Sequence, residues 1–234
     1  MRIIALKARL PVALFLVPLI GSAAVAQMPS AGAPGGINTA FVKLFGSVGA
    51  FTAKVDALVL DKSQTEKVRM PMDFAASEGK VRIEINLAQM QGKDLPAATM
   101  DKLKQAGMDR VISLFRPDKK TTYVLYPGTQ SYLNIPFSKG EVEAFEKGLK
   151  LEKTALGKET FDGHACVKNK IVVKNDQAPV LQAITWNAAD LKDFPVQIEM
   201  KQEQDTVRMR FTQIRFVKAD AQQFNIPAAY GLMK

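Results

Sequence analysis

His164 and Cys166 are the two side chains in this sequence whose chemistry and spacing would suit nucleophilic catalysis. Residues two apart on a β-strand point to the same face of the sheet, so an imidazole and a thiol at these positions would lie side by side. The sequence identifies no third group that would orient the imidazole. The alternative is that Cys166 is a small buried hydrophobe and that His164 follows a turn. We favour this structural alternative.

Metal and cofactor chemistry finds little support in the composition. The chain holds one His and one Cys, which excludes zinc sites built on several imidazoles or thiolates. Six methionines raise the idea of a thioether copper site: Met70, Met72, Met90, Met100, Met200 and Met209. Methionines also fill gaps in apolar cores, and we favour that role. Because no G-x-S-x-G elbow, phosphate-binding glycine loop or carboxylate pair is recognisable, we predict that the protein is not an enzyme and needs no cofactor.

The first 26 residues have the features of an export signal. Three basic residues precede a short apolar core at 12–20, and Ala24-Val25-Ala26 is a small-residue site, so we expect cleavage after Ala26. The apolar core is too short to span a bilayer, and no Cys near the cleavage site would carry a lipid anchor. Residues 27–37, which include the run PSAGAPGG, are expected to form a flexible linker. These features predict a periplasmic protein with a single domain at 38–234.

The full chain carries a formal net charge of +9 at pH 7. This charge would suit an anionic partner such as lipid headgroups, although basic charge also serves solubility alone. The one dense basic cluster with aromatic residues, at 116–126, is better explained as a hairpin tip, so we do not expect nucleic-acid binding. Because a single Cys cannot form an internal disulfide, packing must stabilise the fold.

The middle of the sequence predicts an antiparallel meander. Three apolar, β-branched and aromatic runs lie at 111–115, 121–126 and 131–135, separated by two tight turns that contain Pro117 and Pro127-Gly128. Strands joined so closely must be antiparallel, because a parallel return needs a crossover of a dozen or more residues. We therefore expect the rest of the chain to extend this meander on both sides.

Apolar and polar residues alternate before and after the meander, which is typical of strands with one buried and one solvent-exposed face. Further strands are expected at 51–59, 68–74, 81–87, 150–156, 164–174, 180–186, 196–201 and 207–216, the last with a bulge near Thr212. Short helices are expected around Phe41, between Leu95 and Gly107, and after a capping box formed by Ser138 and Glu141.

A sheet of about 10–11 antiparallel strands accumulates enough twist that it must curl. The predicted fold class is therefore mainly β: a strongly curved antiparallel sheet that forms an open half-barrel, with short helices covering the concave face. Pro71 within the second strand indicates an edge position or a bulge, because proline cannot donate to a ladder. Gly157-Lys158 is expected to form a turn after the strand at 150–156.

Several turn and strand signatures in this sequence form a recognisable set. They are Gly79-Lys80-Val81-Arg82-Ile83, Arg116-Pro117-Asp118-Lys119 followed by Tyr123-Val124-Leu125-Tyr126-Pro127, the run 156–166, Trp186 with Asp190-Leu191, the run 195–199, and the run 224–230. On these features the chain resembles the LolA/LolB-type family of bacterial periplasmic lipoprotein carriers and its soluble relatives. The resemblance implies an open half-barrel with a helical lid over an apolar cavity that accepts acyl chains. Without a lipobox Cys, the chain looks more like the soluble carrier than the anchored receptor, and no lid-latching residue can be matched.

The leading hypothesis is a periplasmic protein that binds and transports an acyl chain, a phospholipid or a lipoprotein non-covalently. A membrane-bound donor or acceptor protein would be a further partner. The alternative is a non-enzymatic envelope interaction protein with a closed core and no lipid cargo. We predict apolar ligand contacts at Phe41, Phe45, Met70, Met72, Phe74, Ile83 and Ile85, and weaker electrostatic headgroup contacts at Arg69 and Arg82.

Overall fold

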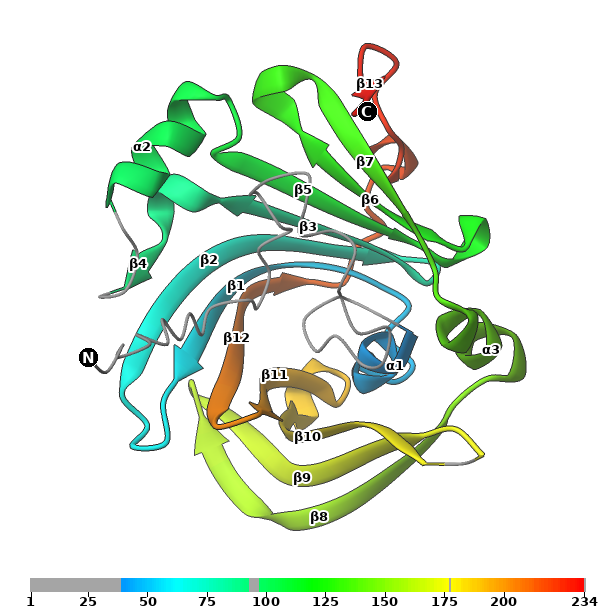
Figure 1. Ribbon diagram of the computed structural model, residues 1–234. Helices are drawn as coiled ribbons and strands as arrows, with labels where there is room; N and C mark the ends of the chain where they lie inside the picture. Colours follow the sequence, from blue (N-terminus) through cyan, green and yellow to red (C-terminus); the bar gives the residue numbers. More distant parts are fainter. Residues whose placement is uncertain (1–38, 93–96, 177, 234) are drawn as a thin grey trace, which may run out of the picture. The chain divides into compact units, whose positions relative to one another are not determined.

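The computed structural model describes residues 39–92, 97–176 and 178–233. The predicted signal peptide, its cleavage site, the predicted linker and the start of the helix expected from Leu95 lie outside the described residues. Among the residues described, no helix is both long enough and apolar enough to cross a membrane. Most of this chain belongs to one large, strongly curved sheet that does not close into a barrel (Figure 1).

Within the described residues, the sheet contains thirteen strands. The first half of the chain supplies β1 (Ala50–Leu60), β2 (Glu66–Ser77), β3 (Lys80–Asn86), β4 (Gln91–Gly92), β5 (Arg110–Arg116), β6 (Thr121–Tyr126) and β7 (Ser131–Pro136). The second half supplies β8 (Lys150–Phe161), β9 (His164–Lys174), β10 (Pro179–Ala188), β11 (Phe194–Gln202), β12 (Asp205–Arg215) and β13 (Gly231–Leu232). All strands except β4 and β13 correspond to strands predicted from the two-residue period.

Helices are few and short in the described residues. They are α1 (Thr39–Val42) continued by the 3-10 turn η2 (Lys43–Phe45), α2 (Ala97–Gln105), α3 (Lys139–Lys147), and the 3-10 turns η3 (Leu87–Gln89), η4 (Pro117–Lys119), η5 (Pro127–Thr129), η6 (Ala189–Leu191) and η7 (Ala221–Phe224). The predicted capping box of α3 is confirmed, because Ser138 Oγ accepts from the Glu141 amide while the Glu141 carboxylate accepts from the Ser138 amide. Gly107 follows α2 with φ of +68°, which glycine adopts readily at a helix end.

The strand order places distant parts of the sequence next to one another. It runs β13-β7-β6-β5-β3-β2-β1-β12-β11-β10-β9-β8, with β4 paired to β2 off this path. Every pairing is antiparallel except that of β13 with β7, which is parallel. Because β1 pairs with β12 in the middle of the sheet, the connection from β7 to β8 passes from one end of the sheet to the other, and this connection carries α3.

Of the two irregularities predicted within strands, the edge position or bulge at Pro71 is wrong, because β2 lies between β1 and β3 and its register with β1 does not shift at Pro71. Pro71 lies between the part of β2 that pairs with β3, which begins at Met72, and the part that pairs with β4, which ends at Arg69. On the side of β2 that faces β3 and β4, the missing N–H of Pro71 therefore costs no ladder hydrogen bond. The bulge predicted near Thr212 is confirmed, because the register between β1 and β12 shifts there and Gln213 has φ of +50°.

The turn predicted at Gly157-Lys158 is wrong. β8 continues through both residues to Phe161, and its register with β9 is irregular at Gly157. The chain reverses instead at Asp162-Gly163, whose φ values of +49° and +82° suit a two-residue hairpin turn. Gly157 therefore introduces a bulge within a long strand rather than an end to it.

The two faces of the sheet differ in chemistry. The inner face, around which the sheet curves and on which α1 lies, is apolar (Figure 1). The outer face carries ion pairs that link neighbouring strands: Lys54 with Asp73 at 2.5 Å, Arg69 with Asp56 at 2.5 Å, Arg208 with Glu199 at 2.6 Å, and Arg110 with Glu84. Partial burial acts to raise the pKa of Glu84, but hydrogen bonds from Arg82 and Arg110 outweigh it, so the pKa lies below its ordinary value.

The C-terminal segment covers the part of the outer face that is apolar. Phe224 packs with Ala75 and Ala219, and Tyr230 packs against a cluster on β5 and β6. That cluster consists of Ile112, Leu114 and Leu125, with Tyr123 and Tyr132 beside it. The segment ends in β13, which pairs with β7.

Arg116 anchors this segment. Its side chain is buried and donates to both carboxylate oxygens of Asp118, at 2.8 and 2.7 Å. It also donates to the carbonyl oxygen of Phe224 at 2.6 Å and to Oδ1 of Asn225 at 2.9 Å. A bidentate pair leaves further guanidinium N–H groups free, so one side chain can hold a turn and a distant segment together.

We predict that Arg116→Met destabilises the fold and releases the C-terminal segment. The substitution leaves the Phe224 carbonyl and the Asp118 carboxylate without their partner, which costs about 2–4 kcal/mol. Urea unfolding would measure the loss, and limited proteolysis within residues 216–233 would detect release. Arg110→Met, on the same strand but half-exposed, is the matched control. Equal losses in both variants, without faster proteolysis in Arg116→Met, would contradict the assignment.

We also predict that Glu84 makes stability depend on pH. Because its pKa is lowered in the folded state, its contribution is fully present above its unfolded pKa of about 4.3 and is lost as the pH falls through the folded value. Glu84→Gln should therefore flatten the fall in unfolding free energy below about pH 4.3. Urea midpoints at several pH values measure this. An unchanged acid slope in the variant would show that Glu84 is not responsible.

Candidate functional site

The inner face of β2 and its neighbours is built from apolar residues that lie opposite one another across strands. Phe74 on β2 lies opposite Ala53 on β1 and Ile83 on β3. Met72, two residues earlier, lies opposite Ile85 in the same way. All five side chains are at most 6% exposed. This part of the sheet therefore forms a closely packed apolar wall.

Phe45, at the end of η2, is the centre of an aromatic cluster on this wall. Its ring lies with centroid separations of 4.9–5.6 Å from the rings of Phe41, Phe51, Phe74, Phe194 and Phe211. These rings come from α1, β1, β2, β11 and β12. Tilted and edge-to-face aromatic pairs contribute about 0.5–1.5 kcal/mol beyond the apolar area that they bury. The cluster therefore fixes η2 against the sheet and fills the adjoining part of the inner face.

A pocket of about 340 Å³ lies beside this cluster, between the α1–η2 segment and α3. Its apolar lining includes Val42, Phe45, Val48, Phe51, Phe115 and Phe145. Phe145 belongs to α3 and is 43% exposed, so the pocket wall that it forms is open to solvent. The volume lies at the lower end of the roughly 300–1,000 Å³ typical of small-molecule sites.

Few polar groups line the pocket. The hydroxyl of Thr39 is buried and has no hydrogen-bond partner among the described residues. Such a group costs about 1–3 kcal/mol when it stays unsatisfied, and a ligand oxygen or a water molecule would satisfy it. Lys43 and Lys80 also line the pocket, and Lys80 lies 3.5 Å from Glu78. The pocket thus combines apolar walls with one unpaired hydroxyl and two cations.

The structure brings one of the predicted contact residues to the lining of this pocket and places the others elsewhere. Of the seven apolar residues predicted, Phe45 lines the pocket. The other six are buried in the inner-face core: Phe41, Met70, Met72, Phe74, Ile83 and Ile85. Their side chains form the packed wall of the inner face. That they contact a ligand stays a prediction.

Arg69 and Arg82, the predicted headgroup contacts, lie on the outer face, away from the pocket. Arg69 donates to Asp56 at 2.5 Å and to both carboxylate oxygens of Glu66. The hydrogen bond from Arg69 is the main reason that the pKa of Glu66 is lowered. Arg82 donates to Glu84 at 2.7 Å. Both guanidinium groups therefore already have carboxylate partners.

Sequence reasoning missed most of the pocket lining. Val48 lies on the helical stripe predicted around Phe41, Val42 lies beside that stripe, and Phe145 lies on the apolar stripe of α3, but none of the three was predicted to contact a ligand. The stripes were visible as apolar residues at helical spacing. What the sequence did not reveal is that α1 and α3, about a hundred residues apart in the chain, form one pocket with Phe115 at the end of β5.

His164 and Cys166 do not form an activated pair. His164 Nδ1 lies 2.7 Å from Oδ2 of Asp190, so an orienting carboxylate is present. The Cys166 thiol, however, is buried, and burial raises its pKa, as do the charges of nearby carboxylates including Asp190. A nucleophilic cysteine needs the opposite, a pKa lowered by positive surroundings. Cys166 is therefore a packed thiol, as the structural alternative predicted.

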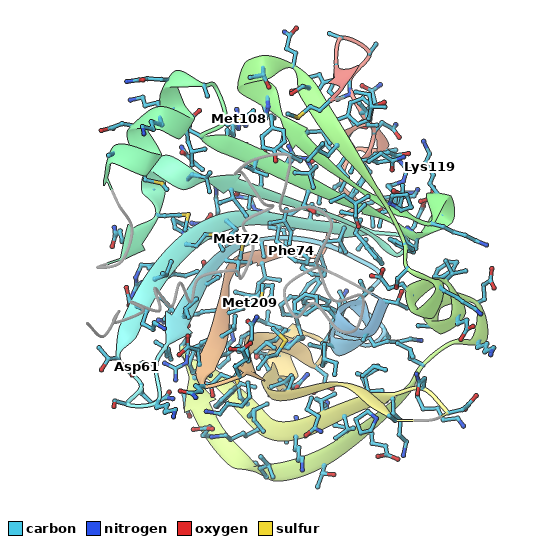
Figure 2. The ribbon with its side chains drawn as sticks, in the orientation of Figure 1. Asp61, Met72, Phe74, Met108, Lys119 and Met209 are labelled. Atoms are coloured by element: carbon cyan, nitrogen blue, oxygen red, sulfur yellow. The ribbon has the colours of Figure 1, made fainter. Side chains whose placement is uncertain are left out.

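Methionines contribute to the inner core from several strands. Met72 on β2 and Met209 on β12 are 3% and 0% exposed, and Figure 2 labels both in the region around which the sheet curves. Met70 is also buried, which is the gap-filling role that we favoured. Among residues 39–92, 97–176 and 178–233, no group of three or more His, Cys, Asp or Glu side chains is placed to hold a metal ion.

Comparison with known proteins gives structural neighbours only. No protein-family model matches the sequence, and none of the curated proteins compared with it matches. A LolA superfamily protein of Nitrosomonas europaea aligns with 78% of this chain and 93% of its own, at 9% identity and a TM-score of 0.38. Lipoprotein LppX of Mycobacterium tuberculosis aligns with 74% and 92%, at 12% identity and a TM-score of 0.38.

The Pseudomonas aeruginosa MucA/MucB complex provides a further match. It aligns with 80% of this chain and 60% of the matched chain, at 11% identity and a TM-score of 0.39. One of the solved structures that this chain is similar to is thus described as a LolA superfamily protein. These overlaps are too loose to transfer a ligand or partner, so the chemistry of this chain rests on its own residues.

We predict that Phe45→Ala is strongly destabilising, whereas Phe145→Ala is not. Phe45 is 4% exposed among five rings, so its truncation leaves a cavity and costs about 3–5 kcal/mol. Phe145 is 43% exposed, and its truncation should cost less than about 1 kcal/mol. Urea unfolding followed by circular dichroism measures both. Similar losses in the two variants would mean that the cluster does not hold η2 in place.

Proposed function

We propose that this protein binds a single acyl chain non-covalently in the pocket between α1–η2 and α3. The observation that carries the proposal is a pocket of about 340 Å³ with apolar walls and an exposed apolar rim at Phe145. Each CH₂ group removed from water there would contribute about 0.8 kcal/mol. An acyl chain needs such a site because it gains affinity mainly from apolar burial.

The polar groups of the pocket suit the head of such a ligand. The unpaired Thr39 hydroxyl could donate to a carboxylate or ester oxygen, which would remove the cost of leaving it unsatisfied. Lys43 and Lys80 would supply positive charge to a fatty-acid carboxylate or a lipid phosphate. A free fatty acid, a phospholipid and the acyl group of a lipoprotein share this arrangement of apolar chain and oxygen-bearing head.

We further propose that binding serves transport in the periplasm. The predicted signal peptide supports export, and a carrier would exchange its cargo with a membrane-bound donor or acceptor protein. The proposed activity involves no covalent step, so it needs no cofactor. The buried, neutral thiol of Cys166 is in keeping with this proposal.

The second candidate function is that of an interaction protein with a closed core. The aromatic cluster favours it, because Phe45 and its neighbours occupy part of the inner face that a larger lipid would need. In that case the pocket would be a packing defect at the end of the core, and a partner would bind elsewhere on the surface.

Uptake of a fluorescent fatty acid by delipidated protein tests the proposal. We predict saturable binding by the unmodified chain and a loss of affinity of about ten-fold or more in Phe145→Asp, because the substitution places a charge in the apolar wall. Val217→Asp, at an apolar residue that is 51% exposed and outside the pocket lining, is the matched control and should bind normally.

Absence of saturable uptake by the unmodified chain would overturn the proposal and favour the closed-core alternative. Equal weakening by Phe145→Asp and Val217→Asp would show that binding takes place outside this pocket. Circular dichroism of each variant checks that the sheet remains folded.

A further inference from the structure

A second pocket, of about 370 Å³, lies on the outer face of the sheet. Its lining includes Thr52, Lys54, Asp73, Arg82, Glu84 and Arg215. These residues belong to β1, β2, β3 and the end of β12. Side chains alternate between faces along a strand, so the charged side chains of this pocket lie on the face opposite to Ile83. Ala53, Phe74 and Ala75 also line the pocket.

The pocket is built by the bulge in β12 and the segment that follows it. The register between β1 and β12 shifts beside Lys54, where Gln213 has φ of +50°. Beyond this bulge the chain returns over β2, and Phe224 is buried with Ala75. Gln213 at the bulge and Gln223 in the returning segment also line the pocket. A bulge that re-aims the chain thus creates a recessed, solvent-open polar site where a regular strand would leave a flat face.

The charges in this pocket do not balance. Lys54 pairs with Asp73 at 2.5 Å, and Arg82 pairs with Glu84 at 2.7 Å. Arg110, next to the pocket, also bonds Glu84, so that carboxylate faces two guanidinium groups. Arg215 has no carboxylate partner among the described residues. The site therefore carries a surplus of positive charge that its own acids do not neutralise.

We propose that this outer-face pocket binds the phosphate group of a phosphate ester. Arg215 would provide an unpaired, planar set of N–H donors, which matches two phosphate oxygens. Arg82 is oriented by its bond to Glu84, and that bond uses one of its terminal nitrogens. The Thr52 hydroxyl and the Gln213 and Gln223 amides add neutral donors around the same space.

A phosphate ester fits better than an apolar or cationic ligand. Charged and polar side chains dominate the lining. An apolar ligand would remove several ion pairs from water without offering them hydrogen bonds in return, which costs free energy. A cation would meet the surplus positive charge. The volume exceeds what a bare phosphate ion fills, which leaves room for the organic part of an ester. The source could be a soluble phosphate ester or a phospholipid headgroup, since both present the same phosphate oxygens.

Isothermal titration of the full chain with glycerol 3-phosphate tests this site. We predict saturable binding that weakens by about ten-fold or more in Arg215→Gln, because the unpaired guanidinium is removed. Arg215→Lys, which keeps the charge but loses the planar donor set, should bind with intermediate affinity. Lys218→Gln is the matched control, because it removes one exposed positive charge three residues away and outside the pocket lining.

Vesicles separate the two sources. Flotation with anionic phosphatidylglycerol vesicles that depends on Arg215 but not on Lys218 would assign the site to a headgroup. Titration by glycerol 3-phosphate without such flotation would assign it to a soluble ester. Absence of saturable binding to either probe, or equal weakening by Arg215→Gln and Lys218→Gln, would overturn the proposal. Phe145→Asp should leave this binding unchanged, which distinguishes the site from the apolar pocket.

Discussion

The packing of Phe45 against five other aromatic rings is the interaction on which the rest of this structure depends. A curved sheet with one apolar face needs a cover, and η2 provides it by inserting one ring between side chains from β1, β2, β11 and β12. Phe45 contacts Phe51 on β1 and Phe211 on β12, so one ring packs against strands that come from opposite ends of the chain. The position of η2 in turn sets one wall of the apolar pocket, whose other wall is α3.

The two faces of the sheet divide the protein's chemistry. The inner face is apolar and packed, and the pocket opens where the chain crosses from β7 to β8 through α3. The outer face carries cross-strand ion pairs, and over β5 and β6 Ile112, Leu114 and Leu125 make part of it apolar. That patch must be covered, and the C-terminal segment covers it with Tyr230 while Arg116 holds its path. The same segment contributes Gln223 to the polar pocket, beside Arg215 at the end of β12, so the segment that covers an apolar patch also borders the proposed anion site.

Much of this fold could be predicted from local patterns, because the two-residue period and the turn residues act over short distances. The strands from β5 to β7, the α3 capping box and the bulge near Thr212 were all predicted in this way. The two-residue strands β4 and β13 have no period to detect. Gly157 was misread because a glycine within a strand can introduce a bulge as well as a turn. The site was predicted less well, because the approach of α1, α3 and β5 is a long-range consequence of strand order that no local pattern encodes.

The central claim is that the pocket beside Phe45 holds an acyl chain, and native mass spectrometry of gently purified protein tests it most directly. The spectrum should show protein with one bound acyl species, and solvent extraction should release a fatty acid, phospholipid or lipidated peptide in equal amount. If the Phe145→Asp variant is recovered without the bound acyl species, the species binds in this pocket. An unmodified chain that is found empty after gentle purification, and that stays empty when mixed with fatty acids or phospholipids, would contradict the account.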